Sequence, residues 1–340
     1  MTGDTVSNLP RQADRRGRGV VVNEVLVTGS SGFVGQHVAA GLAAGGWLVT
    51  GVDLVPPAGT VEGVRHVTAD AADPRVLAEV AAGRYAAVVH QAAITDTLES
   101  DWARLRSVNV DGALALARAC ARAGARFVYA SSHSVYGTVR RRVPVAEHDV
   151  YDTALCSGPL NPYARSKLLL DERMADGFGS TLAWAGLRYT NVFGDGELPK
   201  GRMACILTQL VRATASGERL TLFADSLTAA RDYVPAAVVA DAVRRLVEAP
   251  EAVESGVYNL GSGHAVTFAT VVEWCARFGD GKLDVRLVNN PNAAAYQYWT
   301  CADNGRLDAA LPDRSRVAPG DIMAEAERLH RGFRLASTAY

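Results

Sequence analysis

Lysine is nearly absent from this chain of 340 residues. Of the 35 basic residues only Lys167, Lys200 and Lys282 are lysine, and the others are arginine. Arginine serves wherever a solvated cation is needed, whereas only the lysine amine has a pKa that burial and neighbours shift usefully toward neutrality. Each remaining lysine is therefore a candidate for a chemical role.

Other absences exclude whole classes of protein. No stretch of about 18 apolar residues runs without a polar break, so no transmembrane helix is predicted. The five cysteines are odd in number and form no CxxC pair, which predicts free thiols in a reducing cytoplasm and no metal site. The 35 basic and 36 acidic residues give a net charge of −1, so the sequence carries no electrostatic footprint for nucleic acid or for an anionic membrane.

The start of the chain differs from the rest in composition. Its first 22 residues are mostly polar and rich in arginine, and they lack the apolar stretch of a signal peptide. We expect a disordered tail over residues 1–22. The chain as a whole contains 49% hydrophobic residues, which is ample for a sizeable core.

Short β-branched runs alternate with alanine-rich amphipathic segments in the first half of the chain. We expect strands at 24–28, 48–52, 65–68, 86–90, 127–130 and 185–190. We expect helices at 35–44, 74–82, 110–123 and 162–175. This alternation predicts βαβ units and hence a parallel sheet. Because the strand runs are apolar throughout, helices should cover both faces of that sheet.

The pattern becomes less regular after residue 191. A helix over 233–247 and a strand over 258–260 are expected to return to the sheet. The predicted fold is therefore α/β, a doubly wound parallel sheet with a smaller, interleaved C-terminal lobe. We expect the sheet domain to comprise 23–190 and 230–262, and the lobe to comprise 191–229 and 263–335.

Three glycines follow the first expected strand and open the first expected helix: Gly29, Gly32 and Gly35. At this spacing they allow a tight turn, a close approach of the backbone to a pyrophosphate, and close packing of helix on strand. Asp53 ends the second expected strand, where a carboxylate accepts hydrogen bonds from ribose hydroxyls. The combination predicts a Rossmann domain that binds NAD. NADP is disfavoured because residues 51–63 contain no cation for its 2′-phosphate.

A second constellation carries proton-transfer chemistry. Ser132 ends an expected strand, and Tyr163 and Lys167 are spaced i and i+4 on an expected helix. A phenol is a poor base near pH 7, but an ammonium one turn away stabilises the phenolate and lowers its pKa. Tyr163 could then take a hydroxyl proton while a hydride leaves for a nicotinamide, with Ser132 hydrogen-bonded to the same oxygen.

These motifs together resemble the extended short-chain dehydrogenase/reductases, from about residue 24 to about residue 334. The segments that carry the resemblance are GSSGFVG (29–35), SSHSVYG (131–137), YARSK (163–167) and LRYTNVFG (187–194). Members of that family oxidise or epimerise nucleotide-activated sugars with tightly held NAD or NADP. The resemblance implies that Ser132, Tyr163 and Lys167 form the catalytic triad. It also implies that Asn109 supports the active-site helix and that Arg231 lies near the nucleotide diphosphate.

The resemblance extends to a larger set of site residues. The implied cofactor-binding residues are Gly29, Ser31, Gly32, Phe33, Val34, Gly35, Asp53, Asp70, Ala71, Gln91, Ala92, Ala93, Asn109 and Lys167. The implied substrate-binding residues are Thr95, Asp96, Ser132, His133, Tyr163, Asn191, Lys200, Arg202, Met203, Gln209, Arg231 and Tyr296. From its position alone, Asp70 could equally be the N-cap of a helix, and His133 could be an ordinary buried polar residue.

Within the family, the sugar 4,6-dehydratases carry an acidic pair directly after the catalytic serine or threonine, and this chain has His133 and Ser134 there. The chain is more similar to the ADP-glyceromanno-heptose 6-epimerases, in which a Lys-Gly segment like Lys200-Gly201 supplies a second catalytic base. We expect Lys200 to lie near the cations Lys167 and Arg202, which would favour its neutral amine.

Other functions fit parts of the same pattern. The alternatives are a UDP-hexose or other NDP-hexose 4-epimerase, an NAD(P)-dependent sugar-nucleotide reductase or dehydrogenase, and a dinucleotide sensor without catalysis. The sensor is disfavoured, because it has little reason to keep Ser132, Tyr163 and Lys167 together.

The family also pairs two helices across a dimer interface, which correspond here to 110–123 and 162–175. The resemblance therefore implies a homo-oligomer, although the apolar residues of these helices fit core packing equally well. They are Ala113, Leu114, Leu116, Leu168 and Leu169.

Overall fold

The computed structural model describes residues 23–249, 253–281, 283–291, 293 and 296–338. The predicted tail over 1–22 and Lys282 lie outside the described residues.

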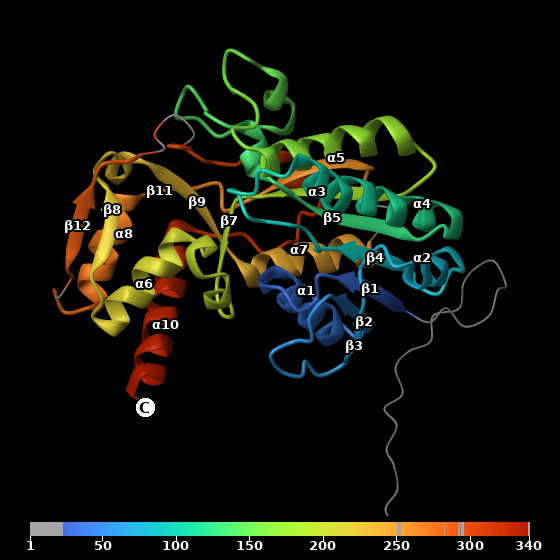
Figure 1. The fold of residues 1–340 in the computed structure, drawn as a ribbon, viewed down its shortest axis with the longest axis horizontal. Helices are drawn as coiled ribbons and strands as arrows, with labels where there is room; N and C mark the ends of the chain where they lie inside the picture. Colours follow the sequence, from blue (N-terminus) through green and yellow to red (C-terminus); the bar gives the residue numbers. More distant parts are fainter. Residues whose placement is uncertain (1–22, 250–252, 282, 292, 294–295, 339–340) are drawn as a thin grey trace, which may run out of the picture.

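A seven-stranded sheet forms the centre of the molecule (Figure 1). Its strands in spatial order are β10 (Gly256–Leu260), β6 (Trp184–Tyr189), β5 (Arg126–Ser132), β4 (Ala87–His90), β1 (Glu24–Thr28), β2 (Leu48–Asp53) and β3 (Val64–Thr68). All neighbouring pairs are parallel. The predicted doubly wound parallel sheet is confirmed. Its order reverses between β1 and β4, and ligands of such sheets bind beside this point at the carboxyl ends of the strands.

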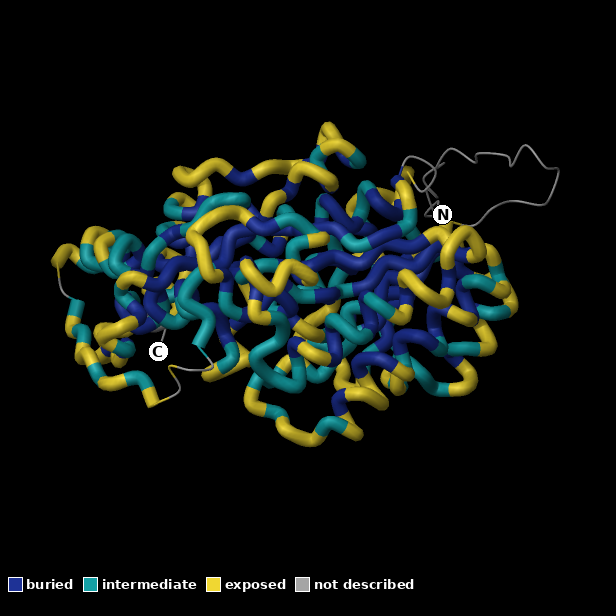
Figure 2. The backbone as a smooth tube through the Cα atoms, turned by 90° about the horizontal axis from the view of Figure 1, so that it is seen from above, coloured by how far each residue is buried: buried dark blue, intermediate teal, exposed yellow. Residues whose placement is uncertain are grey.

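Helices cover both faces of the sheet, as the apolar strands require. The helices α1 (Phe33–Ala44) and α7 (Ala236–Glu248) pack on one face, and α2 (Pro74–Ala81), α4 (Ala113–Ala123) and α5 (Pro162–Phe178) pack on the other (Figure 1). In β1 the side chains of Val25 and Val27 belong to the first core and that of Leu26 to the second. Figure 2 shows the buried segments running through the middle of the molecule.

The smaller lobe lies at one end of the molecule in Figure 1. It contains α6 (Ile206–Ser216), α8 (Phe268–Phe278), α10 (Pro319–Thr338) and the parallel pair β8 (Leu220–Phe223) and β12 (Val285–Val288). A three-stranded sheet of β11 (Ala265–Thr267), β9 (Ala230–Pro235) and β7 (Asn191–Phe193) connects it to the large sheet domain. Apolar residues of the lobe, such as Leu210 and Ile322, join the core beneath α1 and α7.

Two details differ from the sequence-based expectation. The helix predicted over 233–247 begins only at Ala236, because the residues before it form the buried strand β9 and end at Pro235. An apolar strand that runs directly into an apolar helix shows no change of pattern that would mark the boundary. The helix predicted over 110–123 is preceded by a π-helical turn, η1 (Ser107–Gly112), and α4 proper begins at Ala113.

Candidate active site

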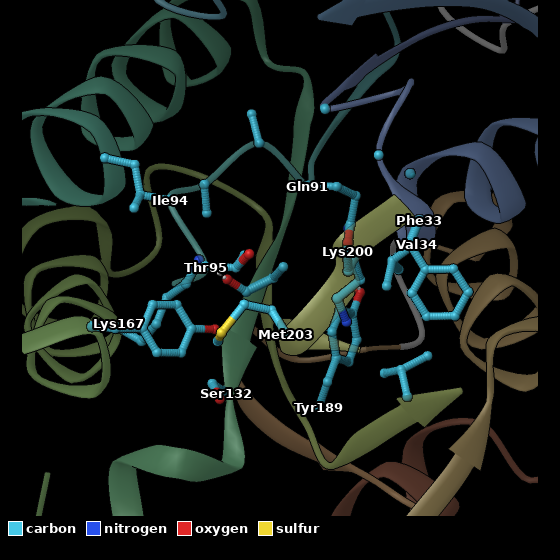
Figure 3. A pocket seen from close by; sticks show the side chains of 18 of the residues that line it. Phe33, Val34, Gln91, Ile94, Thr95, Ser132, Lys167, Tyr189, Lys200 and Met203 are labelled. Carbon is cyan, nitrogen blue, oxygen red and sulfur yellow. Dashed lines mark hydrogen bonds between the residues drawn. The ribbon is translucent and has the colours of Figure 1, made fainter. Parts of the chain in front are cut away.

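A cavity of about 850 Å³ opens at the carboxyl ends of the central strands and extends into the lobe. The loops after β1, β2, β4, β5 and β6 line it, together with residues from the segment 197–206 and from the lobe. Its position at the sheet's switch point is the one expected for a ligand of a doubly wound fold. Figure 3 shows Ser132 and Lys167 on one side of the cavity, and Phe33, Val34 and Lys200 toward the other.

The glycine turn after β1 has no side chains between its backbone and the cavity, so a ligand can approach that backbone closely. Gly29 has a φ of +69°, and a β-carbon there would lie 2.5 Å from the backbone nitrogen of Ala92. A β-carbon on Gly35 would collide with the carbonyl oxygen of Gly29. Gly32 caps α1 without a side-chain hydrogen bond, so the first N–H groups of the helix remain available to phosphate oxygens. These features fit a dinucleotide pyrophosphate.

Two carboxylates, Asp53 at the end of β2 and Asp70 after β3, line this cavity. Asp53 accepts hydrogen bonds from the backbone nitrogens of Ser31 (3.0 Å) and Val55 (3.3 Å), which hold it at the wall. Asp70 also lines the cavity and accepts a hydrogen bond from the backbone nitrogen of Ala72 (2.7 Å). The alternative reading of Asp70 as a helix N-cap is wrong, because Asp73 caps α2.

The structure brings Ser132, at the end of β5, and Tyr163, on α5, to the wall of the same cavity. Burial raises the pKa of the Tyr163 phenol, and the hydrogen bond with Ser132 opposes this shift only in part. The sequence predicts a lowered pKa for Tyr163, whereas burial in the structure raises that pKa. The reason is desolvation, which penalises a phenolate and which helical spacing does not reveal.

Lys167 is buried beneath the tyrosine, with an exposed fraction of 3%. Its Nζ donates a hydrogen bond to the carbonyl oxygen of Ala130 (2.9 Å). Burial lowers the pKa of Lys167 to about 8, while the carboxylate of Asp171 opposes the shift. At pH 7 most Lys167 side chains are therefore charged. The pKa is nevertheless close enough to neutrality for the amine to exchange its proton readily.

Asn109 does not line the cavity but braces two of its walls. The buried Asn109 side chain accepts from the backbone nitrogen of Ile94 (2.8 Å) and donates to the Ile94 carbonyl oxygen (3.0 Å). It also donates to the hydroxyl of Ser166 on α5 (3.0 Å). This geometry fits support of the active-site helix rather than contact with a cofactor.

Lys200 reaches the cavity from η4 (Leu198–Met203). Its Nζ donates to the carboxylate of the buried Glu197 (2.9 Å) and lies 5.3 Å from the ring centroid of Phe33. The sequence places Lys200 among cations that would favour a neutral amine. The ion pair that it forms in the structure is instead with the carboxylate of Glu197.

Most of the predicted site residues line this cavity. They are Gly29, Ser31, Gly32, Phe33, Val34, Gly35, Asp53, Asp70, Ala71, Gln91, Ala92, Ala93, Thr95, Ser132, His133, Tyr163, Lys167, Asn191, Lys200, Met203, Arg231 and Tyr296. Four others do not line it: Asp96, Asn109, Arg202 and Gln209. Arg202 forms an ion pair with Asp96 (3.2 Å). The Gln209 amide donates to the backbone of Ala204 (2.7 Å) and borders a separate groove beside α6.

Arg231 is a buried cation at the lobe side of the cavity. Its guanidinium lies 5.4 Å from the ring centroid of Phe268 and 5.3 Å from that of Tyr296. Its Nη1 donates a hydrogen bond to the backbone oxygen of Ala230 (3.1 Å). A planar cation held between two rings and facing a cavity is suited to a phosphate group.

His133 lies between the serine strand and the lobe, almost fully buried. Its ring centroid is 4.6 Å from that of Tyr136, and burial lowers the pKa of the imidazole to about 3. The side chain is therefore neutral near pH 7 and can both donate and accept a hydrogen bond.

Several lining residues are absent from the predicted set of site residues: Tyr189, Glu197, Phe268, Gln297 and Thr300. Gln297 follows Tyr296 in a Tyr-Gln segment whose likeness to the heptose epimerases predicts a contribution to the sugar pocket. Tyr189 sits in the quoted LRYTNVFG segment, which is a signal that could have identified it. The others come from parts of the lobe whose fold has no strong local pattern.

Other kinds of site are not found in the part of the chain that the structure describes. No cluster of three or more His, Cys, Asp or Glu side chains there is arranged to hold a metal ion. None of the helices in the described ranges combines the length and apolar composition that a membrane span requires. All five cysteines are buried free thiols.

Comparisons with known proteins place this cavity in context. The model of the NAD dependent epimerase/dehydratase family matches residues 25–261. A curated relative, the ADP-L-glycero-D-manno-heptose-6-epimerase of Brachyspira hyodysenteriae, is 29% identical over 303 residues, which cover 85% of this chain and 92% of the relative.

Two solved structures are similar over almost their whole length. One is MoeE5 in complex with UDP-glucose and NAD, with 28% identity, a TM-score of 0.74, and coverage of 91% of this chain and 99% of that one. The other is the UDP-glucose 4-epimerase of Thermus thermophilus in complex with NAD, with 27% identity, a TM-score of 0.76 and the same coverage.

Proposed function

The chain belongs to the NAD dependent epimerase/dehydratase family, and we propose that it epimerises a nucleotide-activated sugar by transient oxidation and re-reduction of one carbinol carbon. The observation that carries this proposal is that Tyr163 and Lys200, from α5 and from η4, line one cavity with the glycine turn. Inversion needs hydride return to the other face of a planar ketone, so proton donors on two sides of the cavity suit it.

NAD is the cofactor of this family, and the residues present fit it. Side chains in place of the glycines would block the turn, and the N-cap of α1, Gly32, has no side chain to occupy the first N–H groups of the helix. Asp53 lies where it would meet the adenosine ribose. When bound, NAD supplies the acceptor and donor of the hydride. Tyr163 takes the hydroxyl proton during oxidation, which requires it to react as the phenolate in spite of its raised pKa, and Ser132 hydrogen-bonds the same oxygen. Lys167 provides positive charge beneath the phenol, and Lys200 gives a proton to the oxygen during re-reduction.

Different parts of the cavity would bind the diphosphate and the sugar of the substrate. Arg231, held between Phe268 and Tyr296, is placed to bind the diphosphate. His133, as a neutral hydrogen-bonding group, faces the same part of the cavity. We propose that the sheet domain of 23–190 with 230–262 binds NAD and that the lobe of 191–229 with 263–335 binds the nucleotide sugar.

We propose an ADP-heptose as the first substrate to test. The curated heptose epimerase is 29% identical over 92% of its length, and Lys200-Gly201 matches the segment that supplies the second base in such enzymes. Arg202 and Gln209 stand where such enzymes typically have a serine and a histidine. Neither side chain lines the cavity, since Arg202 pairs with Asp96 and Gln209 bonds the backbone of Ala204. They therefore do not select the sugar directly.

A UDP-hexose 4-epimerase is the second candidate. It is favoured by two NAD complexes of similar identity, 28% and 27%, one of which also holds UDP-glucose. A reductase is disfavoured, since it would have no use for a second donor opposite Tyr163.

The test is incubation of the purified protein with ADP-heptose, UDP-glucose and UDP-N-acetylglucosamine, followed by chromatographic separation of epimers. Conversion of one substrate to an equilibrium mixture without added cofactor supports the proposal. Accumulation of an oxidised sugar with net reduction of NAD identifies a dehydrogenase instead. Tyr163→Phe protein is the control, because it keeps the ring and lacks the acid–base group.

We further propose that the protein acts in the cytoplasm as a homo-oligomer. The five free thiols fit a reducing compartment. Three of the residues considered for the interface, Ala113, Leu114 and Leu116, are buried in the core of the monomer. Leu168 and Leu169 instead border a shallow groove with Trp102, and an interface would use this part of α5.

A further inference from the structure

Glu197 is a carboxylate that lines the cavity although its side chain has no exposed surface. Burying an ionised carboxylate is costly unless hydrogen bonds replace the water that it loses. Glu197 has three donors. Its Oε1 accepts from the backbone nitrogen of Cys205 (2.7 Å) and from Lys200 Nζ (2.9 Å), and its Oε2 accepts from the hydroxyl of Thr208 (2.5 Å).

Two of these donors fix the carboxylate itself. Cys205 is the N-cap of α6, and its side chain makes no capping hydrogen bond. Thr208 lies in the first turn of the same helix and is fully buried. The N-terminus of a helix carries partial positive charge, which stabilises an anion there. Glu197 is thus anchored at the start of α6 independently of Lys200.

The third donor is the amine that the reaction uses. Lys200 follows Glu197 by three residues, and its long side chain would otherwise have many rotamers. The carboxylate on one side and the ring of Phe33 on the other confine the Nζ atom between the lobe and the glycine turn. Gly201, with a φ of +55°, turns the chain directly after it. The amine is therefore held at the cavity wall by its ion pair, although about a third (34%) of the Lys200 side chain is exposed.

We infer that Glu197 is a positioning residue, which holds Lys200 at the cavity wall as a charged proton donor. This inference rests on the proposed function, in which Lys200 completes the inversion. During re-reduction an N–H bond of Lys200 breaks and an O–H bond of the product alcohol forms, and the carbon would regain the hydride that bound NAD had accepted from it. Tyr163 has by then gained the substrate's proton, which must pass to solvent while Lys200 regains a proton from solvent before the next turnover. The carboxylate of Glu197 takes no part in these bond changes and only holds the amine in place.

The first readout of the test is independent of turnover. The purified holoenzyme is treated with acetic anhydride, and acetylation of each lysine is followed by peptide mass spectrometry. Only three lysines are present, so the Lys200 peptide is readily resolved. Glu197→Gln should accelerate acetylation of Lys200 by roughly five- to tenfold, because loss of the ion pair releases the amine from the carboxylate and leaves it free to react.

The matched control is Thr208→Val. It removes another buried hydrogen bond of the same carboxylate but leaves the ion pair with Lys200 intact. In the Thr208→Val protein, Lys200 should be acetylated at a rate within about twofold of the parent rate. This should hold even if the melting temperature of Thr208→Val falls as far as that of Glu197→Gln. A purely structural role of Glu197 would make the two variants equal. If Glu197→Gln does not fold, Glu197→Asp keeps the charge but draws it away from Lys200, and the same acceleration is expected.

The second readout separates the inference from the proposed function. Epimerisation should fall roughly tenfold or more in Glu197→Gln, while substrate-dependent reduction of bound NAD through Tyr163 persists. An active parent whose Glu197→Gln and Thr208→Val variants behave alike in both readouts would overturn the role of Glu197 and leave the proposed function standing. An inactive parent in which only Glu197→Gln accelerates acetylation would overturn the proposed reaction and support the positioning of Lys200.

Discussion

Lys167 lies one helical turn after Tyr163 on α5, with its Nζ 6.0 Å from the centroid of the phenol ring. The amine does not face water, because it is buried and bonded to the carbonyl oxygen of Ala130. Burial raises the pKa of the Tyr163 phenol and lowers the pKa of the Lys167 amine to about 8. An amine with a pKa this close to neutrality, one helical turn from a phenol that lines the same cavity, is typical of a site for proton transfer.

Replacing Tyr163 by phenylalanine should lower turnover by roughly 10²–10⁴, which is the usual contribution of a positioned acid–base group. The ring is kept, so the melting temperature should change little. The measurement is the initial rate of epimer formation together with a thermal unfolding curve. A folded Tyr163→Phe protein with parental turnover would contradict the assigned mechanism.

Replacing Lys200 by methionine should abolish epimerisation but leave the first half of the reaction. Methionine fills a similar volume beside Phe33 and has no proton to give. Substrate should therefore still reduce bound NAD through Tyr163, which absorbance of the reduced nicotinamide reports. Parental epimerisation by Lys200→Met would mean that the ketone rotates within the cavity and that Tyr163 alone serves both faces.

The parts of this structure that short-range patterns determine were predictable. The run around Val25, Leu26 and Val27 is apolar at every position, which indicates a strand covered on both faces, and the glycine spacing after it indicates the phosphate turn. The direction of the Tyr163 pKa was not predictable, because helical spacing reveals its neighbour Lys167 but not the loss of water around the ring.

Glu197 shows the same limit. In the sequence it is an acid between a glycine and a leucine, where a solvated loop residue would also occur. Its burial depends on Cys205 and Thr208, eight and eleven residues further on, and therefore on the packing of α6 against the cavity. Long-range packing of this kind leaves no local signal in a single sequence.

Asp53 should set the preference for NAD over NADP. Its carboxylate is held by the backbone nitrogens of Ser31 and Val55 where it would repel a 2′-phosphate. Asp53→Asn removes the charge at nearly constant volume, so the ratio of affinities should shift toward NADP by roughly tenfold. Calorimetric titration with both dinucleotides measures this ratio. Extraction of NADP rather than NAD from the parent protein would overturn the assignment.

Stability should fall as the solution is acidified from about pH 6.5, because two histidines are buried in neutral form. Burial lowers the pKa of His90 and of His133 to about 3, whereas the ordinary value in an unfolded chain is about 6.5. Between these values the unfolded chain binds protons that the folded protein does not. The free energy of unfolding is therefore not lowered by these histidines above pH 6.5. It decreases as the pH falls toward 3, by up to about 1.4 kcal/mol per pH unit for each histidine.

Urea unfolding at intervals between pH 7 and pH 4.5 measures this slope, and two variants at one site isolate the cause. His90→Asn removes a titrating group, so its stability should depend on pH less steeply than that of the parent by about one proton. Thr28→Val removes the hydroxyl that hydrogen-bonds His90 Nδ1 (2.7 Å) but leaves the imidazole buried against Phe127. It should lower stability at every pH by roughly 1 kcal/mol and keep the parental slope. Equal slopes for His90→Asn and the parent would show that His90 is not the group whose burial resists protonation.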